Sequence, residues 1–130
     1  MNAPREPGRM LIVDDNRVNR LLLTHALEQN GHRVSTAENG KIAMEMLRGK
    51  SYDVILLDID MPVMNGFEVL EALLSDNELR DLPVVMTSAS DELDRVVKCI
   101  EMGAEDYLVK PLNPILLRAR VNASLEKKRL

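Results

Sequence analysis

The chain has 130 residues, a length that suits one domain with a single hydrophobic core. Its hydrophobic fraction of 45% is ordinary for a globular protein and excludes wholesale disorder. The net charge of −4 disfavours a nucleic-acid-binding surface, which is usually basic. No run reaches the roughly 18–20 apolar residues that a membrane span needs, and one cysteine, Cys99, cannot form an internal disulfide. These features predict a soluble protein of the reducing cytoplasm that binds neither nucleic acid nor membrane.

Strand-like apolar runs alternate with helix-like segments, after a polar, proline-containing stretch at 1–8 that we expect to be a loose tail. No internal repeat or low-complexity segment divides the rest, so residues 9–130 are interpreted as one domain. The expected strands are 11–13, 33–37, 54–57, 83–86 and 107–109, and the expected helices are 17–29, 40–48, 67–75, 91–102 and 114–128.

Two of these helices carry more specific expectations. Asn16 and Ser90 are residue types that cap helix starts, and we expect them to cap the first and fourth helices. In the first helix, the fourfold spacing of Val18, Leu22 and Ala26 predicts the face that packs on the core.

Five strand–helix units of this length predict an α/β fold, in which helices cover both faces of a doubly wound, five-stranded parallel sheet. Ligands bind such sheets at the carboxyl edge, where the strand order reverses. If the first and third strands, which both end in aspartates, flank that point, the strand order is 2-1-3-4-5.

Polar residues follow four of the strands, and their chemistry is complementary. They are Asp14-Asp15, Asp58, Thr87-Ser88 and Lys110-Pro111. Carboxylates gathered at one edge repel unless a cation sits among them, and oxygen ligands select a hard ion such as Mg2+ or Mn2+. One aspartate could act as a nucleophile and form an acyl phosphate, while Lys110 and Ser88 contact the aspartate or the phosphate.

Four motifs in this order resemble those of the receiver domains of two-component response regulators, including chemotaxis-regulator-like domains. The motifs are 11–16, 56–62, 84–89 and 103–111, and the resemblance extends from Arg9 to about Ser124. It implies a flavodoxin-like (βα)5 fold in which Asp58 is the phosphoacceptor. It also implies that Lys110 is the family's lysine and that the peptide bond between Lys110 and Pro111 is cis.

The resemblance also implies a metal site. Asp15 and Asp58 would bind Mg2+ by carboxylate, Asp60 by its backbone carbonyl, and Asp14 through a water molecule.

The switch hydroxyl has two candidates, Thr87 and Ser88. The family pattern has the switch residue immediately before an alanine, and Ala89 follows Ser88. Because side chains alternate along a strand, only one of the two can point at the site. We therefore expect Ser88 to be the switch and Thr87 to face the other side, with Tyr107 as the aromatic residue that swings inward when the hydroxyl moves.

The function implied is a phosphorylation-gated module, which is not an enzyme beyond accepting and slowly losing its own phosphoryl group. A histidine kinase or phosphotransfer protein would phosphorylate Asp58, and the fourth helix, fifth strand and fifth helix would pass the change to an output domain or effector. The alternative is a phosphatase of the haloacid dehalogenase type, because Asp58 and Asp60 match its nucleophile-x-acid pattern.

The last helix carries two apolar series. Leu117, Val121 and Leu125 are expected to pack on the sheet. A second, heptad-like series consists of Leu116, Ala119, Ala123 and Leu130. This series suggests two hypotheses. The helix could continue into a linker to an output module, and two copies of the chain could form a homodimer through it.

Overall fold

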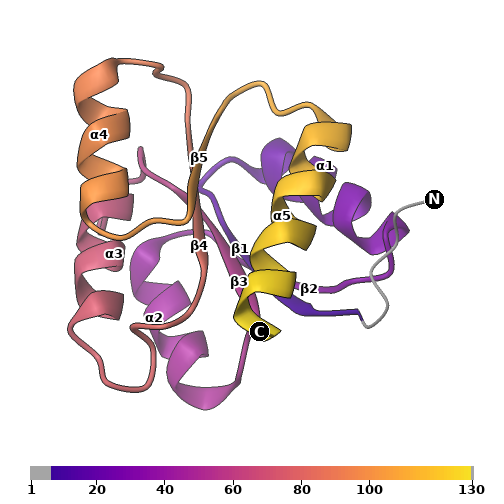
Figure 1. Cartoon of the computed structure of the whole chain (residues 1–130), viewed down its shortest axis with the longest axis horizontal. Helices are drawn as coiled ribbons and strands as arrows, with labels where there is room; N and C mark the ends of the chain where they lie inside the picture. The colour runs from indigo at the N-terminus through magenta and orange to yellow at the C-terminus, as the bar shows by residue number, and fades with distance from the viewer. Residues whose placement is uncertain (1–6, 130) are drawn as a thin grey trace.

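The structure is a computed structural model that describes residues 7–129, with side chains as far as Lys127. Strands and helices alternate along this range (Figure 1). In chain order they are β1 (Arg9–Val13), α1 (Arg17–Gln29), β2 (Arg33–Ala37), α2 (Gly40–Gly49), β3 (Val54–Asp58), α3 (Gly66–Leu74), β4 (Val84–Ser88), α4 (Leu93–Glu101), β5 (Asp106–Val109) and α5 (Pro114–Arg129).

The strands form one parallel sheet in the order β2-β1-β3-β4-β5. Helices α1 and α5 lie on one side of this sheet, and α2, α3 and α4 lie on the other (Figure 1). The predicted fold class and strand order are therefore confirmed. Neighbouring strands β1 and β3 leave the sheet toward helices on opposite faces, which creates the reversal point at which such folds bind ligands.

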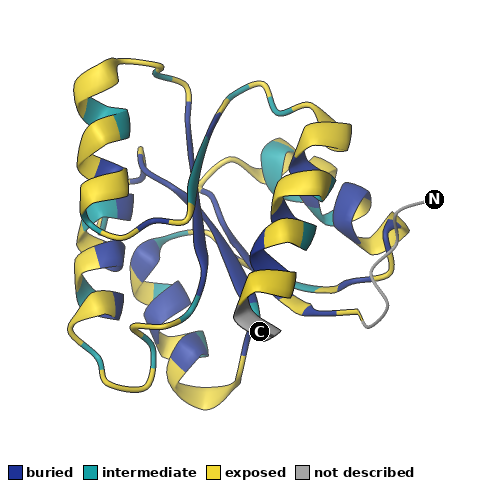
Figure 2. Cartoon of the chain, in the orientation of Figure 1, coloured by how far each residue is buried: buried dark blue, intermediate teal, exposed yellow. Residues whose placement is uncertain are grey.

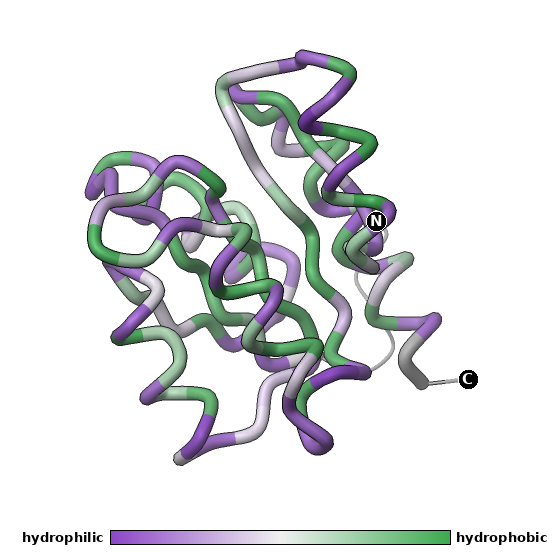
Figure 3. The backbone as a smooth tube through the Cα atoms, turned by 90° about the vertical axis from the view of Figure 1, so that its left-hand side faces the viewer, coloured by the Kyte–Doolittle hydropathy of each residue, from purple (hydrophilic) through white to green (hydrophobic). Residues whose placement is uncertain are grey.

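The core consists of two apolar layers, one on each face of the sheet. Every residue of β3 and β4 is buried, and so are four of the five residues of β1. Figure 2 shows this buried centre between helices whose outer faces are exposed, and Figure 3 shows the same strands as hydrophobic runs. Burial on both faces explains why these strands read as continuous apolar runs instead of alternating patterns.

Helix α1 has the predicted bounds but not the predicted face. The side chain of Asn16 caps it by accepting a hydrogen bond from the N–H of Asn19 (2.9 Å). Val18 and Leu22, expected in the core, are 62% and 64% exposed. A series at fourfold spacing turns by about 40° per step around the helix, so its earlier members leave the face on which Ala26 is buried. The buried residues of α1 are Leu23, Ala26 and Leu27.

Helix α4 begins later than expected, and Ser90 does not cap it. The hydroxyl of Ser90 instead accepts a hydrogen bond from the N–H of Glu92 (3.2 Å) within the preceding turn. Glu92 occupies the N-cap position without a side-chain hydrogen bond. The side chain therefore stabilises a local turn that competes with the helix start.

Helix α5 matches its prediction. Asn113 caps it by accepting hydrogen bonds from the N–H groups of Ile115 (2.8 Å) and Leu116 (3.2 Å). The core-facing series is confirmed, because Leu117, Val121 and Leu125 are at most 1% exposed. Leu130, the last member of the heptad-like series, lies outside the described residues, as do residues 1–6 of the expected tail. Gly8, within the expected tail, is buried and donates its N–H to His32 Nδ1 (3.0 Å).

Candidate phosphoacceptor site

The parallel register of the sheet brings the polar strand ends to one edge. Val13 of β1 lies opposite Leu57 of β3, so the residues that follow them, Asp14 and Asp58, are neighbours. On the other side of β3, Asp58 lies opposite Thr87 of β4. The peptide bond between Lys110 and Pro111 is cis, as the resemblance implied.

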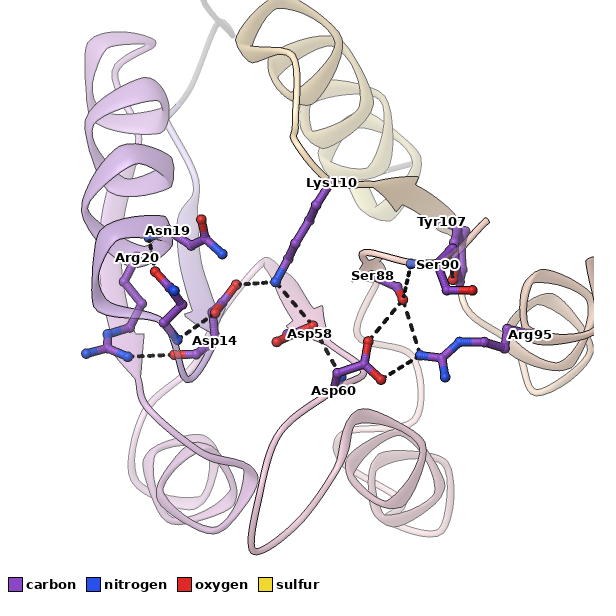
Figure 4. A network of polar contacts seen from close by, with 11 residues as sticks. Asp14, Asn19, Arg20, Asp58, Asp60, Ser88, Ser90, Arg95, Tyr107 and Lys110 are labelled. Carbon is purple, nitrogen blue, oxygen red and sulfur yellow. Dashed lines mark hydrogen bonds and ion pairs between the residues drawn. The ribbon is translucent and has the colours of Figure 1, made fainter. Parts of the chain in front are cut away.

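Lys110 joins the two buried aspartates. Its Nζ lies 2.9 Å from Asp14 Oδ2 and 3.3 Å from Asp58 Oδ1 (Figure 4). The side chains of Asp14 and Asp58 are 1% and 2% exposed, whereas that of Lys110 is 20% exposed. Backbone N–H groups hold the same carboxylates, because Asn16 donates to Asp14 Oδ1 (2.8 Å) and Asp60 donates to Asp58 Oδ1 (3.2 Å). The site is thus a pair of buried carboxylates that a partly exposed lysine bridges at the edge of the sheet.

Burial dominates the titration of Asp58. It raises the pKa of this carboxyl from 3.8 to about 6, against the opposing charge of Lys110 and with the help of the neighbouring Asp14 charge. Burial by itself would lower the pKa of Lys110, but its hydrogen bond to Asp14 and the charge of Asp58 raise it overall. Lys110 therefore carries a positive charge at neutral pH. Asp58 is mostly ionised at that pH, although burial of its charge lowers the stability of the fold.

Three carboxylates lie close enough together to hold a cation. Asp14, Asp15 and Asp58 each offer an oxygen, and these oxygens all lie within 4.8 Å of one another. Asp15 is exposed, so water reaches the cradle from one side. If all three acids are ionised, Lys110 balances only one of the three negative charges. An oxygen-only, negatively charged set that is open to water fits a hard divalent ion such as Mg2+.

A second polar cluster lies beside Asp58 and centres on Ser88. The Ser88 hydroxyl, which is fully buried, donates to Asp60 Oδ2 (3.2 Å) and accepts from the N–H of Ser90 (3.1 Å). Arg95 of α4 contacts both Asp60 and Ser88, with Nη2 2.8 Å from Asp60 Oδ1 and 3.2 Å from Ser88 Oγ (Figure 4). The hydroxyl of Tyr107 donates to the carbonyl of Ser90 (2.6 Å).

Two residues of this region were not predicted from the sequence. Arg95 lies 35 positions from Asp60, so no local pattern predicts their contact. Gly66 packs against the end of β3, and a Cβ there would lie 2.5 Å from the carbonyl oxygen of Asp58. In the sequence, Gly66 follows Asn65, and an Asn-Gly pair is a turn signal. A side chain at position 66 would displace the backbone of Asp58.

Comparison with known proteins identifies the family of this chain. A family model described as the response regulator receiver domain matches residues 10–122. The chain belongs to the response regulator receiver family. Similar receivers include Protein PilH of Pseudomonas aeruginosa, which is 39% identical over 118 residues that cover 91% of this chain and 98% of PilH.

Solved structures agree with this membership. The chemotaxis response regulator CheY4 of Vibrio cholerae is 31% identical, with a TM-score of 0.86 and coverage of 92% of this receiver and 100% of that chain. By sequence, the receiver is also similar to the response regulator PleD of Caulobacter vibrioides, with 40% identity over 89% of this receiver, but the match covers only 26% of PleD. These matches give no support to the haloacid dehalogenase alternative. In the described part of the receiver, no helix is long and apolar enough to cross a membrane.

Proposed function

We propose that this receiver accepts a phosphoryl group on Asp58 from a histidine kinase or a phosphotransfer protein in the cytoplasm. The observation that carries the proposal is the buried Asp58 carboxylate, which Lys110 Nζ contacts at 3.3 Å beside two further aspartates. Asp15 and Asp58 would hold Mg2+ or Mn2+ by carboxylate, Asp60 by its carbonyl, and Asp14 through water. The bound ion would neutralise negative charge on the phosphoryl oxygens.

The transfer itself needs little from the protein beyond position and charge. A carboxylate oxygen of Asp58 attacks phosphorus, an O–P bond forms, and the N–P bond of the donor phosphohistidine breaks with its electron pair returning to the imidazole. Lys110 is already bound to Asp14 and Asp58, so its ammonium can stabilise the charge that develops on the phosphoryl group without rearranging first. Loss of the phosphoryl group to water would be slow, and no separate substrate is turned over.

The first turns of α1 supply a surface on which a phosphodonor could dock. Val18, Leu21 and Leu22 are each at least 60% exposed. They lie on α1, which begins two residues after Asp15, so a protein bound there sits beside the edge of the sheet that carries Asp58. Exposed apolar side chains grouped on one helix are typical of protein-binding surfaces.

The output of this proposed switch runs through Ser88 and Tyr107 to the face formed by α4, β5 and α5. A phosphoryl group on Asp58 adds negative charge and hydrogen-bond-accepting oxygens at the sheet edge where Ser88 also lies. These additions favour one of two arrangements of the face formed by α4, β5 and α5. This face carries exposed apolar side chains that an output domain, an effector or a second copy could cover. They are Leu93, Val97, Ile100, Val109, Ile115 and Leu116. We do not include nucleic acid among the partners of this domain, because the chain is acidic.

Phosphorylation by a small donor tests the proposal without a cognate kinase. Acetyl phosphate with Mg2+ should add one phosphoryl group, measured as intact mass, and the group should be stable in acid and labile in base. Asp58→Asn and addition of EDTA should each abolish the gain, whereas Asp81→Asn, which removes an exposed carboxylate elsewhere, should leave it unchanged. Equal labelling of Asp58→Asn and the wild type would refute the assignment.

A further inference from the structure

Arg95 occupies a position that acceptor chemistry alone does not explain. It lies in the first turns of α4, yet its guanidinium contacts the loop after β3 and the end of β4 (Figure 4). The guanidinium carbon also lies 5.9 Å from the centre of the Phe67 ring in α3. One side chain thus connects three elements next to Asp58.

The Ser88 hydroxyl has a single proton, and that proton is already in use. It goes to Asp60 Oδ2 (3.2 Å), so Ser88 cannot donate to a phosphoryl oxygen on Asp58 until this hydrogen bond breaks. The carboxylate of Asp60 therefore competes with the phosphoryl group for the same hydroxyl.

Arg95 determines whether this competitor stays in place. The side chain of Asp60 is 54% exposed and could otherwise turn toward water. The ion pair with Arg95 Nη2 (2.8 Å) holds one carboxylate oxygen and thereby directs the other at Ser88. The same Nη2 donates to Ser88 Oγ (3.2 Å), which fixes the hydroxyl from a second side. All three groups form one closed set of contacts in the resting receiver.

We propose that the Asp60–Arg95 ion pair is a latch that holds Ser88 in its resting orientation, so that Arg95 is a positioning residue of the switch. This inference rests on the proposed phosphoacceptor function of Asp58. Opening the latch frees the Ser88 hydroxyl and removes the contact between α4 and the loop after β3. Loss of either charged partner therefore raises the fraction of receiver in the activated arrangement before any phosphoryl group is present.

The effect is modest and measurable. A partly exposed ion pair contributes little free energy, so breaking it should shift the equilibrium between the two arrangements by about two- to fivefold. Amide chemical shifts at 107–113 report this shift. The side chain of Tyr107 interacts with Arg95 directly, so the direction in which these amides move has to separate a population shift from a purely local effect of the substitution at position 95. The two reference spectra are those of the wild type alone and of the wild type saturated with beryllofluoride and Mg2+.

The test compares Arg95→Met with Lys98→Met. Lys98 lies on the same helix, with Nζ 4.1 Å from the centre of the same Phe67 ring, so its replacement removes a matched cation–ring contact but leaves the latch intact. Without ligand, the 107–113 amides of Arg95→Met should move along the line that joins the two wild-type spectra, toward the activated one. Those of Lys98→Met should stay at the resting position. Asp60→Ala should move them in the same direction, and the double variant should move them no further than Asp60→Ala alone.

Three patterns of amide shifts would overturn the latch. They are shifts of Arg95→Met off that line, shifts equal to those of Lys98→Met, and additive effects of Asp60→Ala and Arg95→Met. A need for more beryllofluoride in Arg95→Met than in the wild type would also overturn it, because Arg95 would then assist the activated state. If beryllofluoride leaves the wild-type spectrum unchanged, the phosphoacceptor proposal itself fails, and this result is distinct from a failure of the latch.

Discussion

An ionised Asp58 should destabilise the receiver when no metal ion is bound. Its carboxylate is 2% exposed, and burial is the main reason that its pKa rises from 3.8 to about 6. A shift of about two units corresponds to about 3 kcal/mol at pH values where the carboxylate is ionised in both the folded and the unfolded chain. Water at the open side of the site screens part of this penalty, so we expect Asp58→Asn to stabilise the metal-free fold by about 1–3 kcal/mol at pH 7.5.

The pH dependence follows from the direction of the shift. Because the pKa of Asp58 is raised on folding, the folded state binds this proton more tightly than the unfolded state does. Stability therefore falls as pH rises through the interval from about 4 to about 6 and is recovered as pH is lowered through it. The advantage of Asp58→Asn should accordingly shrink below pH 6 and vanish near pH 4.

Urea unfolding in EDTA, followed by circular dichroism, measures this difference as a change in midpoint at constant slope. Asp81→Asn is the matched control, because it removes an exposed carboxylate and should change stability by less than about 0.5 kcal/mol. Adding Mg2+ should reverse the order, since binding to the folded wild type stabilises it and the variant lacks one carboxylate. If Asp58→Asn is less stable than the wild type in EDTA at pH 7.5, or if its advantage persists at pH 4, the reasoning is wrong.

Three further predictions concern the cation, the donor and the output face. Asp15→Ala should weaken Mg2+ binding at least tenfold in isothermal titration, whereas Thr87→Ala should leave it nearly unchanged; equal effects would refute the proposed ligands. Leu22→Lys should slow phosphorylation by a histidine kinase or phosphotransfer protein that phosphorylates the wild type, but not by acetyl phosphate, because only the protein donor needs the exposed α1 surface. If activation promotes dimerisation through α5, sedimentation should show increased self-association with beryllofluoride and Mg2+, and Leu116→Lys should abolish this increase without affecting phosphorylation; unchanged sedimentation of the wild type would exclude the dimer.

Much of the fold could be predicted because burial leaves a strong trace in the sequence. The central strands are covered on both faces, so they appear as continuous apolar runs, and each run ends at a polar residue of the sheet edge. The sheet register then places Asp14 beside Asp58 without further assumptions. The cap at Asn16 was predictable because it depends on a residue only three positions away.

Features that depend on rotation or on distant contacts were harder to predict. The apolar residues of α1 fit two overlapping stripes, and spacing alone did not show that Leu22 belongs to the exposed one. Ser90 could serve a helix or a turn, and the choice depends on the local backbone. The contact between Arg95 and Asp60 joins α4 to the loop after β3, and only the packed structure brings these residues together.

The central claim is that Asp58 is the residue that receives the phosphoryl group. Borohydride reduces an aspartyl phosphate to homoserine, so peptide mass mapping of receiver treated with acetyl phosphate, Mg2+ and then borohydride identifies the modified position. The account predicts homoserine at position 58 and at no other aspartate. Homoserine at Asp14, Asp15 or Asp60, with none at Asp58, would contradict it.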